Sequence, residues 1–205
     1  MNVSTLYTVG HSNRTLEEFL SLITENEVTA IADVRSSPYS PMSPQFNCVL
    51  LKRSLQKKNI SYVFLGQELG ARRDEDCCYE DGVARYELIA KTEAFRDGLK
   101  RVRDGSQSHR IGMMCAEKDP LTCHRTILVH RHLKDEIPIT HIVTEGRLET
   151  QEEAENRLLL TLNMDDRSLF ASRDEPLSEA YEKQGSKIAH RSGKDSTKMN
   201  MEHPS

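Results

Sequence analysis

The segment Cys115–Arg125, CAEKDPLTCHR, concentrates side chains that can act as nucleophiles, acids or metal ligands. Cys115 ends an apolar run, and the cysteine and histidine near the other end of the segment fall in the first turn of a helix that we expect to begin at Asp119-Pro120. A thiol near a helix N-terminus and an arginine is favoured as thiolate, whereas the intervening acidic residues oppose that charge. The alternative for Cys115 is a buried cysteine that only packs. The candidate catalytic residues are Cys115 and Glu117, and the candidate ligand-binding residues are Cys123, His124 and Arg125.

A metal site is the second chemistry to weigh in this segment. Cys115, Cys123, His124 and His11 offer thiolate and imidazole groups. The spacing C-x7-C-H is not one of the recurrent zinc patterns. On a helix, the neighbouring residues Cys123 and His124 would project about 100° apart, so one site rarely uses both. We therefore expect no metal ligands here. The residue types do not identify a cofactor.

Two further candidates for acid or base catalysis follow other apolar runs. His11 comes after Leu6–Val9 and precedes a capped helix, so it is either a general acid or a side chain that bonds the turn. Asp33 lies near the end of Val28–Val34, where α/β enzymes commonly keep a base or a ribose-binding carboxylate. The alternative for Asp33 is an ion pair with a nearby arginine. Neither G-x-G-x-x-G nor a P-loop occurs, which disfavours a standard dinucleotide or nucleoside-triphosphate site.

Arginines recur in the same loops. If the loops meet at one edge of a sheet, their guanidinium groups suit the oxygens of a phosphate or carboxylate. The anion can instead be internal, because acidic residues occupy the same loops. The expected ligand-binding residues outside the cysteine segment are Arg14, Arg35, Glu68 and Arg72.

The elements that must position these residues alternate along the chain. Five apolar runs of strand length are Leu6–Val9, Val28–Val34, Tyr62–Leu65, Ile111–Cys115 and Ile139–Val143. Helical spacing is expected over Thr15–Asn26, Cys48–Lys58, Val83–Arg103 (with a break near Thr92), from Asp119-Pro120, and over Thr150–Leu162. Strands that alternate with helices are typical of a parallel sheet, and near-continuous apolar runs fit strands buried on both faces. We predict a single α/β domain with a mainly parallel, five-stranded open sheet flanked by helices, in a Rossmann-like or rhodanese-like arrangement. Ligands of such sheets bind outside the carboxyl ends of the strands, where the candidate residues fall.

The predicted domain covers residues 1–170. Residues 171–205 hold twelve charged residues, six of each sign, and no sustained apolar face. We expect a disordered polar tail there, with one short helix near Leu177–Tyr181.

Composition narrows the class of protein. The 205 residues carry a formal net charge of −4, so a nonspecific coat of nucleic acid is not expected. No apolar run approaches the roughly 20 residues of a membrane span, and the first residues do not resemble a secretory signal. Five cysteines, an odd number, then indicate reduced thiols in the cytoplasm.

Several segments together resemble a known family. The pieces TVGHSNRTLEEF, ADVRSSPYS with a following PQFN, FLGQELGAR, YEDGVARYE and MMCAEKDPLTCHR are similar to the bacterial family catalogued as domain of unknown function 488. The resemblance covers roughly Tyr7 to Gly146 and implies a compact α/β domain. It implies no particular reaction.

Three functions remain open from the sequence. The first is an enzyme that acts on a small anionic substrate, nucleotide-like or phosphorylated, at the carboxyl edge of the sheet. The second is a nucleic-acid binding or base-processing protein that uses the same arginine-rich rim, with Tyr39, Phe46 and Tyr79 available for stacking. The third is a non-enzymatic domain with a structural polar network. The oligomeric state is not predicted.

Overall fold

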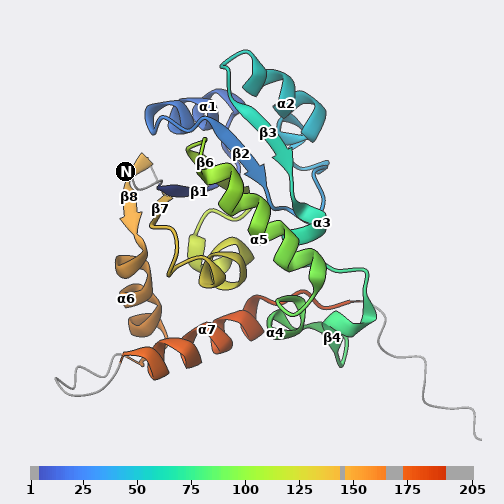
Figure 1. Cartoon of the computed structure of the whole chain (residues 1–205), viewed down its shortest axis with the longest axis vertical. Helices are drawn as coiled ribbons and strands as arrows, with labels where there is room; N and C mark the ends of the chain where they lie inside the picture. Colours follow the sequence, from blue (N-terminus) through green and yellow to red (C-terminus); the bar gives the residue numbers. More distant parts are fainter. Residues whose placement is uncertain (1–4, 144–145, 165–172, 193–205) are drawn as a thin grey trace, which may run out of the picture.

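A computed structural model describes residues 5–143, 146–164 and 173–192 of the chain. Its centre is a six-stranded sheet in the order β3-β2-β6-β1-β7-β8 (Figure 1). The strands are β1 (Leu6–Gly10), β2 (Ala30–Asp33), β3 (Ser61–Phe64), β6 (Ile111–Cys115), β7 (Ile139–Ile142) and β8 (Leu148–Thr150). The first five pair in parallel and β8 pairs antiparallel to β7. The predicted α/β class and its five strands are confirmed, and β8 is an addition at the edge.

Helices cover both faces of this sheet. They are α1 (Leu16–Glu25), α2 (Cys48–Gln56), α3 (Gly66–Leu69), α4 (Tyr86–Ile89), α5 (Glu93–Ser106), α6 (Gln151–Thr161) and α7 (Asp174–Ile188). Thr15 and Thr150 close capping boxes with Glu18 and Glu153, as their spacing predicts. The predicted break near Thr92 is present, because Thr92 caps α5. The helix expected from Val83 does not begin there. Val83–Ala84 is instead strand β5, which forms a short hairpin with β4 (Tyr79–Glu80).

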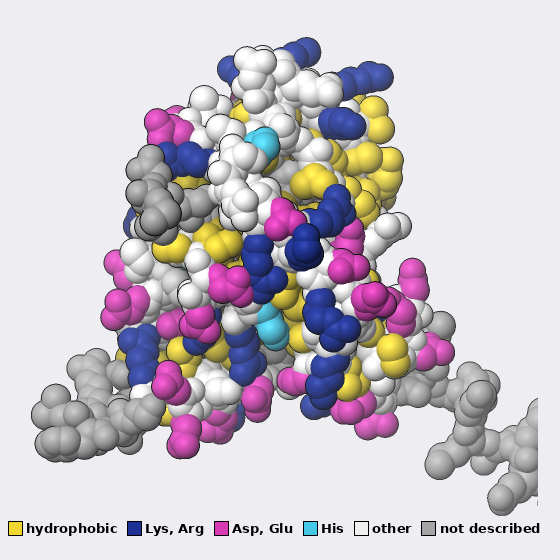
Figure 2. Space-filling view, viewed as in Figure 1, with side chains coloured by type: hydrophobic (Ala, Val, Ile, Leu, Met, Phe, Trp, Pro, Cys, Tyr) yellow, Lys and Arg dark blue, Asp and Glu magenta, His cyan; other side chains and the backbone are white. Residues whose placement is uncertain are grey.

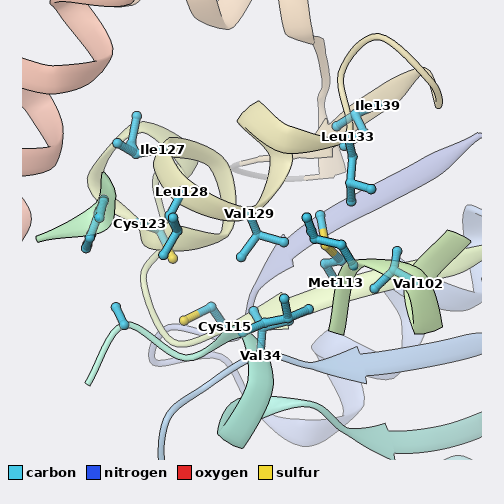
Figure 3. Packing of buried hydrophobic residues seen from close by; sticks show 14 of the residues in the cluster. Val34, Val102, Met113, Cys115, Cys123, Ile127, Leu128, Val129, Leu133 and Ile139 are labelled. Carbon is cyan, nitrogen blue, oxygen red and sulfur yellow. The ribbon is translucent and has the colours of Figure 1, made fainter. Parts of the chain in front are cut away.

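The two faces of the sheet carry separate cores. One is built around Phe19 of α1 and Leu51 of α2, packed near Ile31 and Met114. The other holds Met113 and Cys115 of β6 together with α5 and the segment 121–133 (Figure 3). Because side chains alternate along a strand, Cys115 belongs to the second face.

The carboxyl ends of three strands lie side by side. In the sheet register, Gly10 of β1 is opposite Cys115 of β6, and Asp33 of β2 is opposite Met114. The chain passes from β1 to β2 and returns later to place β6 between them. The loops after β1, β2 and β6 therefore meet at one edge, where such sheets bind ligands.

The short helix expected near Leu177–Tyr181 is present but longer, so residues 174–188 are not part of a disordered tail. These residues form α7, with Leu177, Ala180, Tyr181 and Gln184 buried against the domain. The spacing of these residues is helical, but a small residue and a glutamine fill two of the positions. The predicted domain boundary at residue 170 and residues 193–205 lie outside the described residues.

No helix within the described part of the chain has the length and apolarity to cross a membrane.

Candidate functional site

A cleft of about 770 Å³ opens at the carboxyl edge of the sheet. The loop after β1 contributes His11 and Ser12, and the loop after β2 contributes Arg35 and the serines that follow. Arg72 and the residues after α7 form the facing wall. Cys115, Glu117 and His124 line it from the β6 side. The edge that the sequence predicts for ligands is therefore hollowed.

Four reactive side chains form a compact cluster on this β6 side. The Glu117 carboxylate accepts hydrogen bonds from the thiols of Cys115 and Cys123 at 2.9 and 3.0 Å. The Nδ1 atom of His124 lies 3.8 and 3.9 Å from the same two sulfurs. One ligand atom from each residue lies within 4.8 Å of the others. The two cysteines and the histidine are buried, while the Glu117 side chain reaches solvent.

The cluster depends on a local conformation that differs from the expected helix. Asp119 caps only a short turn over Pro120–Thr122, and Cys123 is extended with φ −132° and ψ 139°. The following turn, Arg125–Val129, is a π-helix that begins after His124. Because Cys123 and His124 are not successive helical residues, both side chains reach the same site (Figure 3 shows Cys123 above Cys115). Cys123 and His124 can therefore serve one site, contrary to the expectation from helical spacing.

The loop after β6 is fastened to the end of β1. The amides of His11 and Ser12 donate to the carbonyl oxygens of Cys115 and Ala116 at 2.9 and 2.8 Å. These bonds continue the ladder between the two strands beyond their ends, and they fix the direction in which the chain leaves Cys115.

Arg125 lies beneath this loop and is fully buried. Its guanidinium donates to the carbonyl oxygens of Glu117 and Lys118 at 2.8 and 3.3 Å. It forms no ion pair with an acidic side chain among the described residues. The sequence predicts Arg125 as a ligand-binding arm, but the structure places it as a support of the loop and as a buried positive charge.

The pKa values of the two cluster cysteines shift in opposite directions. A hydrogen bond to Cys123, together with burial, raises the pKa of Cys115 well above its usual value. Burial also acts on Cys123, but the hydrogen bond from Cys115 and the positive charges of Arg125 and His124 outweigh it and lower its pKa. Burial raises the pKa of Glu117. Of the two sulfurs, Cys123 is therefore the one favoured as thiolate, and these interactions oppose ionisation of Cys115.

Asp33 and Arg35 form a buried ion pair. The guanidinium of Arg35 donates to both carboxylate oxygens at 2.9 and 2.6 Å, and the Tyr62 hydroxyl donates to one of them at 2.8 Å. Asp33 is fully buried and does not line the cleft. The structure therefore contains the ion pair with a nearby arginine that was the alternative to a catalytic Asp33.

His11 is held in the neutral form. Its Nδ1 atom donates to the carbonyl oxygen of Ser12 at 2.9 Å, and its ring stacks on Phe46 with 4.3 Å between centroids. Its Nε2 atom lies 3.4 Å from a guanidinium nitrogen of Arg35. Burial lowers the pKa of His11 to about 4. At neutral pH the unprotonated Nε2 atom is therefore an acceptor for the N–H of Arg35.

The remaining predicted residues divide between the cleft and other places. Arg14 donates to the carbonyl oxygens of Gly10 and Val143 and lines a different hollow. Glu68 pairs with Arg101 of α5. Arg72 is exposed in the cleft, and its guanidinium has no hydrogen bond or ion pair with any residue that the structure describes.

The wall that follows α7 was not predicted from the sequence. His190 and Arg191 line the cleft because this segment pairs with the β4–β5 hairpin: the Ala84 amide donates to the His190 carbonyl oxygen at 2.8 Å, and Arg191 bridges Val83. Figure 1 shows the chain after α7 running past α4 toward β4. The only signal in the sequence was the pair His190-Arg191 beyond a helix that was expected to be short.

Comparison with known proteins gives one match. The family model described as domain of unknown function DUF488 matches residues 15–132. No curated protein matches. No solved structure matches either.

Proposed function

Because the chain belongs to the DUF488 family, whose description assigns no reaction, we propose a function from the cleft itself: an enzyme that acts on a small anionic, phosphate-bearing substrate. The supporting observation is that a cationic rim and a reactive cluster share one cavity. Its volume of about 770 Å³ lies within the range of roughly 300–1,000 Å³ typical of small-ligand sites.

The rim supplies the charge for an anion. Arg72 and Arg191 are exposed and line the cleft from two segments. Arg72 is the stronger candidate, since no described residue neutralises its guanidinium. Arg35 is committed to Asp33, so we assign it to holding the loop and not to gripping the substrate.

The other end of the substrate would face the cluster. Glu117 is the accessible member and touches both thiols, so it is the candidate for proton transfer. Cys115 lines the cleft next to it and is the candidate nucleophile once its proton passes to a neighbour. The negative charge of the cluster keeps the substrate's anionic group on the arginine side.

One aromatic side chain favours a nucleotide-like substrate. Tyr39 lines the cleft and is 57% exposed, so its ring is free to stack on a base. Phe46 is fully buried under His11, and the Tyr79 hydroxyl is bonded to the Arg73 backbone. Figure 2 shows Lys and Arg interspersed with Asp and Glu on the face that α5 covers, where α5 residues pair with Glu68 and Glu136. A single nucleotide fits these features better than a long polymer.

Thermal unfolding with inorganic phosphate, nucleoside monophosphates and sugar phosphates tests the proposal. A ligand at a hundredfold excess over its dissociation constant should stabilise the protein by about 2.7 kcal/mol. Arg72→Gln should weaken binding at least tenfold, since a charge-assisted hydrogen bond contributes about 1.5–3 kcal/mol. Arg53→Gln, an exposed arginine of α2 outside the cleft, is the matched control.

Two outcomes would decide against the proposal. One is that no phosphate-bearing compound stabilises the wild type. The other is that Arg72→Gln and Arg53→Gln respond alike. A salt-dependent gel shift with DNA and RNA, in which Arg72→Gln loses binding, would favour the nucleic-acid alternative instead.

A further inference from the structure

We propose that one divalent transition-metal ion of the zinc class binds to the side chains of Cys115, Cys123, His124 and Glu117. This inference goes beyond the proposed function: it concerns the same cluster but does not depend on phosphate binding, and Cys115 and Glu117 act in it as metal ligands. It also replaces the expectation of no metal, whose geometric premise fails at Cys123.

The spacing of the ligand atoms suits a tetrahedral ion. With zinc–sulfur bonds near 2.3 Å and zinc–nitrogen or zinc–oxygen bonds near 2.1 Å, tetrahedral ligand atoms lie about 3.3–3.8 Å apart. His124 Nδ1 is 3.8 and 3.9 Å from the two sulfurs, and the Glu117 oxygen is 2.9 and 3.0 Å from them. An ion would need the ligand atoms to move by less than about 1 Å.

The histidine is oriented as a metal ligand. Its Nε2 atom lies 2.9 Å from the carbonyl oxygen of Val34, which can only accept, so Nε2 carries a proton. Nδ1 then faces the two sulfurs, and the neutral ring that binds a metal would present its lone pair to them. Metal-bound histidines characteristically donate their other ring N–H to a carbonyl or carboxylate in this way. A pair of cysteines that only formed a disulfide would not require this orientation of His124.

Charge balance also supports an ion. Two thiolates, one carboxylate and one divalent cation sum to −1. The fully buried guanidinium of Arg125, which holds the Glu117 carbonyl oxygen at 2.8 Å, supplies the compensating charge. A buried cation without an acidic partner among the described residues is costly, and an anionic metal centre would offset that cost.

The donor set indicates both the metal and its role. Two thiolates and an imidazole favour zinc over magnesium or calcium, which prefer oxygen ligands. Three ligands are buried and the fourth, Glu117, reaches the solvent side, so water or a substrate can replace it. A site with one exchangeable position is typical of catalytic zinc and not of structural zinc.

Metal titration of the full chain tests this proposal. The protein is purified under reducing conditions, stripped with a chelator and titrated with Zn²⁺ and Co²⁺ without phosphate. We expect one ion per chain and, with Co²⁺, the charge-transfer band of thiolate coordination. Cys115→Ser and Cys123→Ser should each lower the affinity at least tenfold and weaken that band. His124→Gln should also lower the affinity, whereas Glu117→Gln should retain the ion.

Control variants distinguish loss of a cluster ligand from loss of any cysteine. Cys48→Ser and Cys77→Ser change cysteines outside the cluster and should leave the stoichiometry and the band unchanged. Circular dichroism of each stripped variant identifies any that fails to fold. Cys123→Ser and His124→Gln are two separate variants, so the test does not depend on the folding of either one alone. Binding of Co²⁺ without a thiolate band would overturn the proposal. So would wild-type affinity in the cysteine variants, or a Cys115–Cys123 disulfide that forms in place of metal binding.

The result is separable from the proposed function. Metal binding is measured without phosphate, and phosphate binding is measured in the presence of a chelator as well as with Zn²⁺. Metal binding with no response to any phosphate-bearing compound would contradict the proposed function alone. Arg72-dependent phosphate binding with no metal would contradict this inference alone.

Discussion

Gly10 lies so close to Glu117 that a Cβ atom on Gly10 would be 1.8 Å from the Glu117 carbonyl oxygen. The obstacle is backbone, and that backbone is held from the other side by Arg125. The end of β1 and the cluster loop are therefore in direct contact, and the glycine is required for the close approach.

Gly10→Ala should destabilise the protein and displace the cluster loop. Overpacking against backbone costs about 1–3 kcal/mol, and the displacement should move the Glu117 carboxylate from the two thiols. Urea unfolding measures the first effect and Co²⁺ affinity the second. Gly105→Ala is the control, because its Cβ would meet only the end of the Ile111 side chain at 3.1 Å and alanine favours the helix. Equal effects of the two variants would contradict the close approach.

Arg35→Ala should lower the stability of the ligand-free protein strongly. Removing one partner of a buried ion pair costs about 3–5 kcal/mol, because the Asp33 carboxylate is left without its counter-charge. Tyr62→Phe, which removes only a hydrogen bond to the same carboxylate, should cost about 1 kcal/mol. Chemical denaturation compares the two. A small effect of Arg35→Ala, with loss of phosphate binding, would instead make Arg35 a ligand-binding residue.

Leu177→Ala tests the packing of α7. The side chain is 5% exposed, so its truncation should cost about 2–5 kcal/mol. Ser186→Ala, on an exposed position of the same helix, should change the stability little. Thermal unfolding of the two variants and the wild type measures the difference. A wild-type melting temperature for Leu177→Ala would restore the prediction of a tail that contributes nothing to the fold.

The stability should fall as the pH is lowered from 6.5 to 4. Burial lowers the pKa of His141 to about 4 and of His130 to about 3, both below the ordinary 6.5. The unfolded chain therefore binds these protons first, and stability is full above pH 6.5 and lost below it. Between pH 7 and pH 5 the two groups together should remove about 3–4 kcal/mol.

The charged groups around these histidines do not change that direction. Lys134 lowers the pKa of His130, and Arg125 and Arg157 lower that of His141 against the opposing effect of Glu149. Urea unfolding at pH 7 and pH 5 measures the loss. His130→Gln should reduce it by about 2 kcal/mol, since the proton uptake of one buried histidine is removed. His109→Gln, outside the core, is the control. An unchanged loss in His130→Gln would refute this assignment.

Local signals predicted most of the fold. Thr15 and Thr150 cap helices through residues three positions away, and the runs that became β1, β2, β3, β6 and β7 are continuous in sequence. β8 was missed because Leu148–Thr150 is short and its only buried side chain is Glu149. The length of α7 was underestimated, and its packing was missed, because Ala180, Gln184 and Gly185 complete its buried face alongside Leu177 and Tyr181.

The site was predictable only in part, for a related reason. The rule for carboxyl ends of strands placed Cys115, Glu117 and His124 near Arg35, because backbone topology alone brings these loops together. It could not show where long side chains turn. Arg14 turns to the carbonyl oxygens of Gly10 and Val143, and Arg125 turns inward to the loop. Nor could it reveal a wall fastened by pairing between residues more than a hundred positions apart.

The pairing of Arg191 with Val83 also has a consequence for biosynthesis. The chain emerges from the ribosome N-terminus first. Every residue matched by the family model therefore emerges before the residues that form this wall of the cleft. Until residue 191 has emerged, the nascent protein presents the reactive cluster without His190 and Arg191 beside it. Completion of the cleft thus follows the emergence of residue 191, and a polypeptide truncated before that residue would display the cluster on an incomplete cleft.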